Sequence, residues 1–334
     1  MRGNQVSLCY YPTTAILIDD QQPFLTKLQL GLPETRPYQF YANPNDFIAR
    51  FAHHQPEHFI NYCVTFDEDS AQENLIVRQV SLRNIHKEIY NPERFKQVSL
   101  LVADYAMPGH NGLECCDAIH DKYIQKLLLT GEAQNDLAVK AFNQRRINKF
   151  LQKSAPDLMQ TLSSAIAELQ LNYFLELSNS LRDNFKDGLE YLLTVLDDPA
   201  FVKFFYDLCE SKQITEYYIL DTQGSFLLLD DKAKAYWLLL KDETEMNNLF
   251  LHAEAEEAPA EVQDPLRNRS HLPYFHTEAD LQTPPSQWKK YFYPAQRLAG
   301  QQNYYYTLLT DAPFNDLNPK EIKTVQQFLR ESAG

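Results

Sequence analysis

Residues 100–112 read LLVADYAMPGHNG, an apolar run that ends in an aspartate and then breaks into a turn. Four consecutive apolar residues before Asp104 are typical of a strand that is buried on both faces of a parallel sheet. Pro108 and Gly109 end such a strand, and a helical pattern begins beyond Gly112. Open α/β sheets bind their ligands at the carboxyl ends of the strands, so we expect Asp104 to take part in chemistry.

Three further apolar runs end in polar side chains. Residues 15–18 (AILI) precede Asp19 and Asp20, residues 126–129 (KLLL) precede Thr130, and residues 147–152 (INKFLQ) precede Lys153. Helical patterns separate these runs, and strands that alternate with helices predict a parallel, doubly wound α/β sheet. Because the carboxyl ends of parallel strands meet at one edge, the sequence predicts that these polar side chains lie together.

The predicted cluster suits phosphoryl chemistry. Neighbouring carboxylates repel one another, and a hard cation with oxygen ligands relieves that repulsion; Mg²⁺ is the usual choice beside phosphate. A lysine ammonium and a threonine hydroxyl add the donors that a phosphoryl group requires. Simpler explanations stay open for single residues, since Asp19 or Asp20 alone suits a helix N-cap and Thr130 alone suits a strand-end hydroxyl.

Residues 15–153 resemble the receiver domain of two-component response regulators. The resemblance rests on four motifs in the family's order, namely ILIDD ending at Asp20, LVADYAMP around Asp104 with Gly112 following, LLLTGEA around Thr130, and FLQK ending at Lys153. It implies a flavodoxin-like fold in which Asp104 is the phosphoacceptor. It also implies a Mg²⁺ site (Asp19, Asp20, Asp104 and the Ala106 carbonyl), a switch hydroxyl (Thr130), a coupled aromatic ring (Phe150) and a charge paired with the aspartyl phosphate (Lys153).

Two intervals depart from the family pattern. The segment between Asp20 and Asp104 is much longer than a receiver needs, so residues 33–98 are expected to hold an insertion or a rebuilt second strand–helix unit. The segment between Asp104 and Thr130 is a few residues short, which predicts a trimmed third helix or loop. Neither departure removes a residue needed for phosphorylation. A receiver that has lost its chemistry remains the main alternative.

The composition describes an ordinary globular chain of 334 residues with a net charge of −14. This length suggests about two domains of roughly 100–200 residues each. The negative charge disfavours DNA as a partner, because proteins bind a phosphate backbone through Lys and Arg. The five cysteines form no CxxC pair, and neither a signal peptide nor an apolar run long enough to enter a membrane is present, so we expect a cytoplasmic protein.

The boundaries predicted for the rest of the chain are coarser. Residues 1–154 are expected to form the receiver, with residues 1–14 as a loosely held lead-in, and residues 155–212 a helical connector. The long helix beginning near Asp157 would either join two subunits or pack on its own domain. Residues 213–334 alternate short strands with helices, which predicts an α+β output domain with an antiparallel sheet of about five strands.

The resemblance implies a response regulator that a sensor histidine kinase phosphorylates on Asp104 with Mg²⁺. Phosphorylation is then expected to control homodimer formation or contacts of the output domain, whose target is an unidentified protein or small ligand. No enzymatic activity besides its own phosphorylation is expected. The chain combines a receiver, a long interval before Asp104 and an unusual output domain. This layout also resembles that of the Legionella Lqs-type quorum-sensing regulators. An adaptor that is never phosphorylated and a nucleotide-acting enzyme under receiver control are the alternatives.

Overall fold

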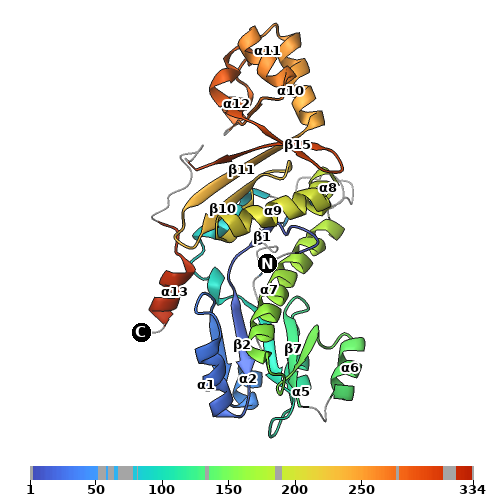
Figure 1. Ribbon diagram of the computed structural model, residues 1–334, viewed down its shortest axis with the longest axis vertical. Coiled ribbons are helices and arrows are strands. Elements are labelled where there is room, and N and C mark those ends of the chain that lie inside the picture. The colour runs from blue at the N-terminus through green and yellow to red at the C-terminus, as the bar shows by residue number, and fades with distance from the viewer. Residues whose placement is uncertain are drawn as a thin grey trace.

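The chain forms two main β-sheets with helices packed on both, as the computed structural model shows (Figure 1). The structure describes residues 3–51, 58, 64–66, 78–80, 82–131, 135–184, 190–275, 278–310 and 321–332. One sheet is parallel and has five strands, and the other is antiparallel and has six. The fold is therefore a doubly wound α/β domain joined to an α+β region, as the sequence predicts.

The parallel sheet has the strand order β3-β2-β6-β7-β8. In chain order its elements are β2 (Thr14–Ile18), α1 (Gln22–Gly31), β3 (Tyr38–Tyr41), α2 (Pro44–Phe51), β6 (Val98–Asp104), α5 (Gly112–Asp117), β7 (Gln125–Thr130), α6 (Asn135–Asn143) and β8 (Lys149–Gln152). Apolar residues of α1 and of the following helix α7 cover one face, and those of α2, α5 and α6 cover the other. Both faces of the central strands are buried, which explains the apolar runs at residues 100–103 and 127–129.

The second strand–helix unit has its ordinary place in this sheet. Strand β3 pairs in parallel with β2, and α2 follows it, so the extra length lies between α2 and β6. Its described elements are β4 (Val64–Phe66), β5 (Arg78–Val80), α4 (Leu82–Lys87) and the 3-10 helices η2 (Glu88–Tyr90) and η3 (Arg94–Lys96). The alternative of an insertion is thus confirmed. Helix α5 has only 6 residues, which confirms the trimmed third helix.

Helix α7 (Leu158–Asn184) belongs to both halves of the molecule (Figure 1). Leu162 and Ile166 pack on the parallel sheet, whereas Phe174 and Leu177 pack in the core of the antiparallel sheet. The helix therefore packs within its own chain, as one of the two sequence-based alternatives states. Helices α8 (Glu190–Asp197) and α9 (Pro199–Ser211) follow it and contribute to the second core.

The antiparallel sheet has the order β1-β9-β10-β11-β15-β14. Its strands are β1 (Cys9–Tyr10), β9 (Ile214–Ile219), β10 (Phe226–Asp230), β11 (Ala235–Asp242), β14 (Gln296–Ala299) and β15 (Asn303–Leu309). The prediction of a loose lead-in over residues 1–14 is wrong, because β1 pairs with β9 and its Cys9 and Tyr10 are buried. A strand of two residues has too little periodicity to be seen in a sequence.

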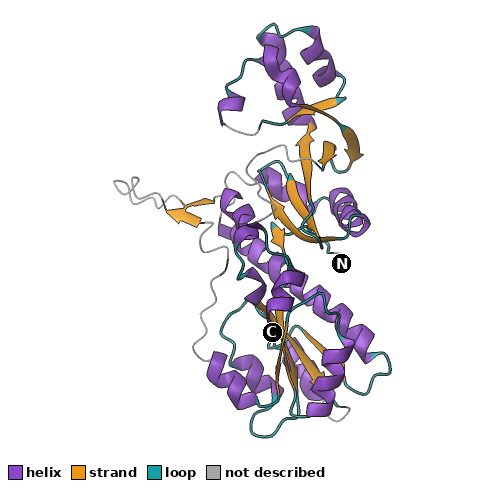
Figure 2. Cartoon of the chain, turned by 90° about the vertical axis from the view of Figure 1, so that its left-hand side faces the viewer, coloured by secondary structure: helices purple, strands orange, loops and turns teal. Residues whose placement is uncertain are grey.

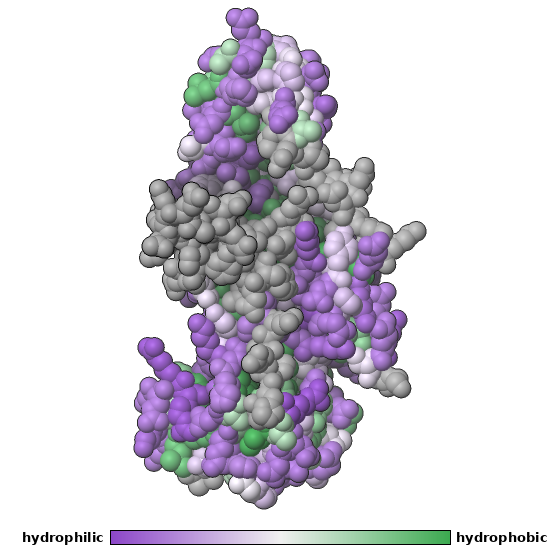
Figure 3. All heavy atoms as spheres, turned by 180° about the vertical axis from the view of Figure 1, so that it is seen from behind, coloured by the Kyte–Doolittle hydropathy of each residue, from purple (hydrophilic) through white to green (hydrophobic). Residues whose placement is uncertain are grey.

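A helical cap is inserted between β11 and β14. It consists of α10 (Glu243–Ala255), α11 (Ala260–Arg267), β12 (His271–Pro273), α12 (Glu278–Leu281), the 3-10 helix η5 (Pro285–Tyr291) and β13 (Phe292–Pro294). Figure 2 shows this cap at one end of the molecule and the parallel sheet, with helices on both sides, at the other. The face drawn in Figure 3 is largely hydrophilic over the described residues, in keeping with the acidic composition.

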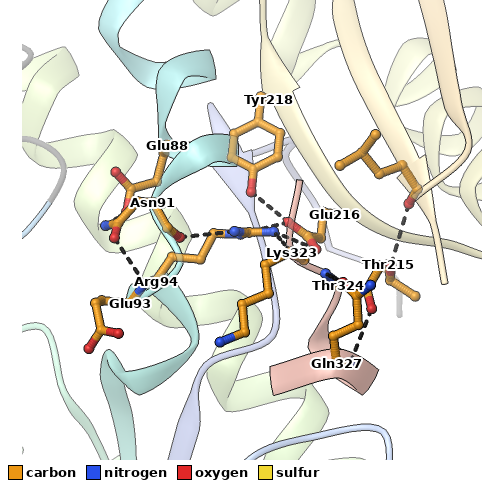
Figure 4. Close-up of polar contacts among 11 residues, drawn as sticks. Glu88, Asn91, Glu93, Arg94, Thr215, Glu216, Tyr218, Lys323, Thr324 and Gln327 are labelled. Carbon is orange, nitrogen blue, oxygen red and sulfur yellow. Dashed lines mark hydrogen bonds and ion pairs between the residues drawn. The ribbon is translucent and has the colours of Figure 1, made fainter. Parts of the chain in front are cut away.

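A buried ion pair ties the inserted segment to the antiparallel sheet (Figure 4). Arg94 of η3 donates to both carboxylate oxygens of Glu216 of β9, at 3.0 and 3.2 Å. It also donates to the Lys323 carbonyl oxygen at 2.7 Å, just before the last helix, α13 (Val325–Ser332). Since η3 leads directly into β6, this network connects the Asp104 strand with the second half of the chain.

Candidate functional site

Asp104 ends strand β6 and is almost fully buried, with 3% of its surface exposed. The turn after it folds back closely, because the Gly112 N–H donates to the Tyr105 carbonyl oxygen at 3.1 Å. A Cβ atom on Gly112 would lie 2.3 Å from the Asp104 carbonyl oxygen, so only glycine fits there. Asn111 and Glu114 form a capping box that starts α5. The sequence thus fixes the backbone around Asp104 tightly.

Strand β2 delivers two carboxylates beside Asp104. Asp19 is 1% exposed and accepts a hydrogen bond from the Gln21 N–H at 3.0 Å, whereas Asp20 is exposed. One ligand oxygen from each of Asp19, Asp20 and Asp104 lies within 4.8 Å of the others. Oxygens on opposite sides of a Mg²⁺ ion are about 4 Å apart, because each lies at roughly 2.0–2.1 Å from the ion. The three carboxylates are therefore close enough to share one divalent cation.

Lys153 follows β8 and bridges two of these carboxylates. Its Nζ atom lies 2.5 Å from Asp19 Oδ2 and 2.9 Å from Asp104 Oδ1. The Lys153 N–H donates to the Thr130 carbonyl oxygen, which anchors the backbone beside β7. A single lysine thus faces three carboxylates, and this part of the molecule keeps an excess of negative charge.

The electrostatics of Asp19 favour a cation beside it. Burial raises the pKa of Asp19 above its ordinary value, and the nearby Asp104 charge acts in the same direction against the lowering effect of Lys153. Asp19 Oδ2 is buried, and its partner among the described residues is the Lys153 ammonium group at 2.5 Å. Mg²⁺ takes carboxylate oxygens as ligands beside phosphate, so the three clustered carboxylates fit the ion.

The remaining predicted residues lie around this cluster. Thr130 ends β7, is fully buried, and its hydroxyl reaches the Leu151 carbonyl oxygen only at 3.4 Å. Phe150 is half-buried on β8 and contacts Phe142 of α6, with ring centroids 6.3 Å apart. Ala106 is exposed in the turn after β6, where its carbonyl oxygen stays a predicted ligand.

One contact of the site escapes sequence analysis. The Phe24 ring of α1 lies under Lys153, with the Nζ atom 4.7 Å from the ring centroid. In the sequence Phe24 is only an apolar position of a helix. Its contact depends on how α1 packs against the loop after β8, which no local pattern encodes.

The structure is similar along almost its whole length to that of the Legionella pneumophila response regulator LqsR. The two share 31% sequence identity and superpose with a TM-score of 0.81, covering 98% of this chain and 96% of that chain. A response regulator receiver domain protein from Clostridium thermocellum matches 47% of this chain and 94% of its own, with 15% identity and a TM-score of 0.32. A CheY-like receiver domain protein from Methanospirillum hungatei matches 48% of this chain and 97% of its own, with 14% identity and a TM-score of 0.31.

No protein-family model matches the sequence, and neither does any curated protein. The parallel sheet, the acidic cluster at its carboxyl edge and the similarity to LqsR define the class of protein as a response regulator with a receiver domain. Because the identity to LqsR exceeds 30% over nearly the full length of both chains, the chain belongs to the family of response regulators that includes LqsR. Within the described residues, none of the helices combines the length and the apolar character that crossing a membrane requires.

Proposed function

We propose that the chain receives a phosphoryl group on Asp104 from a sensor histidine kinase in a two-component signalling system. The observation that carries the proposal is the bridge from Lys153 to both Asp19 and Asp104 at the carboxyl edge of the sheet. In the reaction an Asp104 carboxylate oxygen bonds to phosphorus while the bond between phosphorus and the kinase histidine nitrogen breaks. Asp19, Asp20, Asp104 and the Ala106 carbonyl would hold Mg²⁺, which would supply charge neutralisation for this transfer.

The chain's own residues orient the group and stabilise the product. Lys153 is already placed against Asp104 and is positioned to pair with a phosphoryl oxygen. Phosphorylation adds about −1.5 to −2 charges at neutral pH, which increases the attraction for the ammonium group and for a hydroxyl donor. Thr130 suits that donor role, because its hydroxyl has only long contacts, at 3.4 and 3.5 Å, to break.

A displacement of the Thr130 side chain would change the packing of β8 and α6, and α6 lies at the surface. Phe150, on the neighbouring strand, contacts Phe142, and α6 exposes Leu137 (46%), Val139 (44%) and Phe142 (47%). We propose that this apolar surface of α6 takes part in a homodimer that phosphorylation favours. Coupling of this kind typically amounts to roughly 1–3 kcal/mol, enough to shift a two-state equilibrium.

The proposed organisation is a receiver over residues 1–154, a connector over 155–212 and an output domain over 213–334, with β1 of the N-terminal segment added to the output sheet. The output domain would bind a protein or a small ligand, and the sequence resemblance to the Lqs-type regulators suggests a role in quorum sensing. We place the protein in the cytoplasm, where a histidine kinase domain would meet it.

Phosphotransfer from a purified histidine kinase tests the proposal. The kinase is labelled with ATP carrying radioactive γ-phosphate and mixed with the full chain or with Asp104→Asn, and light scattering follows the molar mass. We expect Mg²⁺-dependent label on the wild type only, together with a shift towards a dimer that Phe142→Ser weakens. Failure of several kinases and of small phosphoryl donors to label the wild type would favour a receiver-like adaptor instead.

A further inference from the structure

Arg36 lies at the end of the parallel sheet opposite to Asp104. It lies two residues before β3, and the carbonyl oxygen of its neighbour Pro37 accepts from the Ala15 N–H where β2 begins. Two other elements meet there, since Tyr10 of β1 and Gln170 of α7 both contact the Arg36 side chain. The receiver sheet, the output sheet and the long helix thus converge on one guanidinium group.

Among the described residues, the positive charge of Arg36 has no negative partner. Its Nη1 atom donates to the Tyr10 hydroxyl at 3.0 Å and to the Gln170 side-chain carbonyl oxygen, and both acceptors are neutral. No carboxylate oxygen of the described residues lies within 4.0 Å of this guanidinium, although the chain carries a net charge of −14. A guanidinium has five N–H donors, and those on Nε and Nη2 have no acceptor among the described residues. Arg36 is partly exposed to solvent.

Tyr38 presents a second unused donor beside Arg36. Its hydroxyl oxygen is buried and has no hydrogen-bond partner among the residues that the structure describes. Burial raises the pKa of Tyr38 to about 12, with Arg36 and Tyr10 as the charged and polar groups that act on it, so the hydroxyl stays protonated at neutral pH. A buried hydroxyl without a partner is costly, so this group calls for an explanation.

The neighbouring residues hold Arg36 in place. The Gln170 amide nitrogen donates to the Thr13 carbonyl oxygen at 2.6 Å and lies 3.2 Å from the Thr13 hydroxyl. These contacts orient the Gln170 side chain so that its carbonyl oxygen faces Arg36. Gln170 and Tyr10 are themselves buried, with 0% and 4% exposure. Nη1 is therefore fixed on one side, and the fork formed by Nε and Nη2 is left free on the other.

We propose that Arg36 and Tyr38 form a binding site for a small oxyanion, a carboxylate or a phosphate group, at the junction of the receiver and output sheets. Two oxygens of such an anion match the parallel donors Nε and Nη2, which is the geometry that makes arginine the preferred ligand for carboxylate and phosphate. The Tyr38 hydroxyl supplies a further hydrogen bond. Because Tyr10 belongs to the output sheet, the bound anion would stabilise the contact between the two halves.

Isothermal titration calorimetry of the full chain tests the site. Inorganic phosphate and acetate are titrated separately at constant ionic strength, with EDTA present so that Mg²⁺ cannot hold an anion at Asp104. We expect saturable binding of at least one anion to the wild type, and the two titrations distinguish phosphate from carboxylate ligands. Arg36→Met should abolish this binding, whereas the matched control Arg50→Met, which changes an exposed arginine of α2, should retain it.

Tyr38→Phe keeps the proposal testable if Arg36→Met does not fold, because it removes a single oxygen atom. We expect about tenfold weaker binding, the loss that one hydrogen bond to a charged group typically causes. The absence of saturable heat with both anions would overturn the proposal. So would binding that Arg36→Met retains, or binding by Tyr38→Phe that is as tight as that of the wild type.

Discussion

Substituting Arg94 by methionine should destabilise the whole chain through the charge that it leaves behind. The Arg94 and Glu216 side chains are 0% and 4% exposed, so neither reaches bulk water. Removal of one partner of a buried ion pair costs about 3–5 kcal/mol, because the remaining charge is uncompensated. The Tyr218 hydroxyl still donates to Glu216 at 2.7 Å, so we expect a loss near the lower end, about 3 kcal/mol.

Urea unfolding followed by tryptophan fluorescence measures this loss. Both tryptophans of the chain, Trp237 and Trp288, are buried in the region that carries Glu216, so their emission reports on its unfolding. The matched control is Arg146→Met, which breaks an ion pair with Asp117 whose side chains are 38% and 51% exposed. Exposed pairs contribute about 0–1 kcal/mol, so this control should stay close to the wild type.

Replacing both members of the pair sharpens the test. Arg94→Met combined with Glu216→Leu leaves no buried charge, so we expect it to be more stable than Arg94→Met alone. If Arg94→Met were no less stable than Arg146→Met, the ion pair would not hold the inserted segment to the antiparallel sheet, and the argument from burial would be refuted.

Three further substitutions probe the carboxylate site. Burial raises the pKa of Asp19 above 3.8, so the charge of Asp19 destabilises the fold once the pH rises through that pKa. Asp19→Asn should therefore raise the melting temperature at pH 7 in EDTA, and this gain should vanish at pH values below 3.8. Mg²⁺ should stabilise only the wild type, and equal melting temperatures at pH 7 would contradict the argument. Gly112→Ala forces a Cβ atom against the Asp104 carbonyl oxygen and should cost about 1–3 kcal/mol in urea unfolding, a loss whose absence would show that the turn can relax. Phe24→Leu removes the ring under Lys153 and should cost about 0.5–2 kcal/mol, and unchanged stability would mean that this contact contributes nothing.

Much of the parallel sheet could be predicted because its strands are long, buried and followed by distinctive residues. Residues 100–103 before Asp104 and residues 127–129 before Thr130 are all apolar, and both runs belong to inner strands of the sheet. Strand β1 could not be predicted, because two residues carry no periodicity and its pairing with β9 joins positions more than two hundred residues apart. The packing of α7 in both cores was left open for a similar reason, since its apolar face does not reveal which sheet covers it.

The site was predictable where a strand end determines a side chain's position. Asp19, Asp20, Asp104 and Lys153 follow their strands directly, so knowing that the sheet is parallel is enough to bring them together. The Phe24 contact, and the Arg36 donors that no carboxylate neutralises, depend on how helices and loops meet in space. Contacts of this kind arise from tertiary packing, which a pattern within one segment does not contain.

Intact-mass spectrometry after treatment with acetyl phosphate tests the central claim most directly. The full chain and Asp104→Asn are each incubated with the donor in Mg²⁺ and in EDTA, and the wild type is then digested to locate the modification. We predict a mass increase of one phosphoryl group on the wild type in Mg²⁺ alone, located on the peptide that contains Asp104. An unmodified wild type, or an equal increase in Asp104→Asn, would contradict the assignment of Asp104 as the phosphoacceptor.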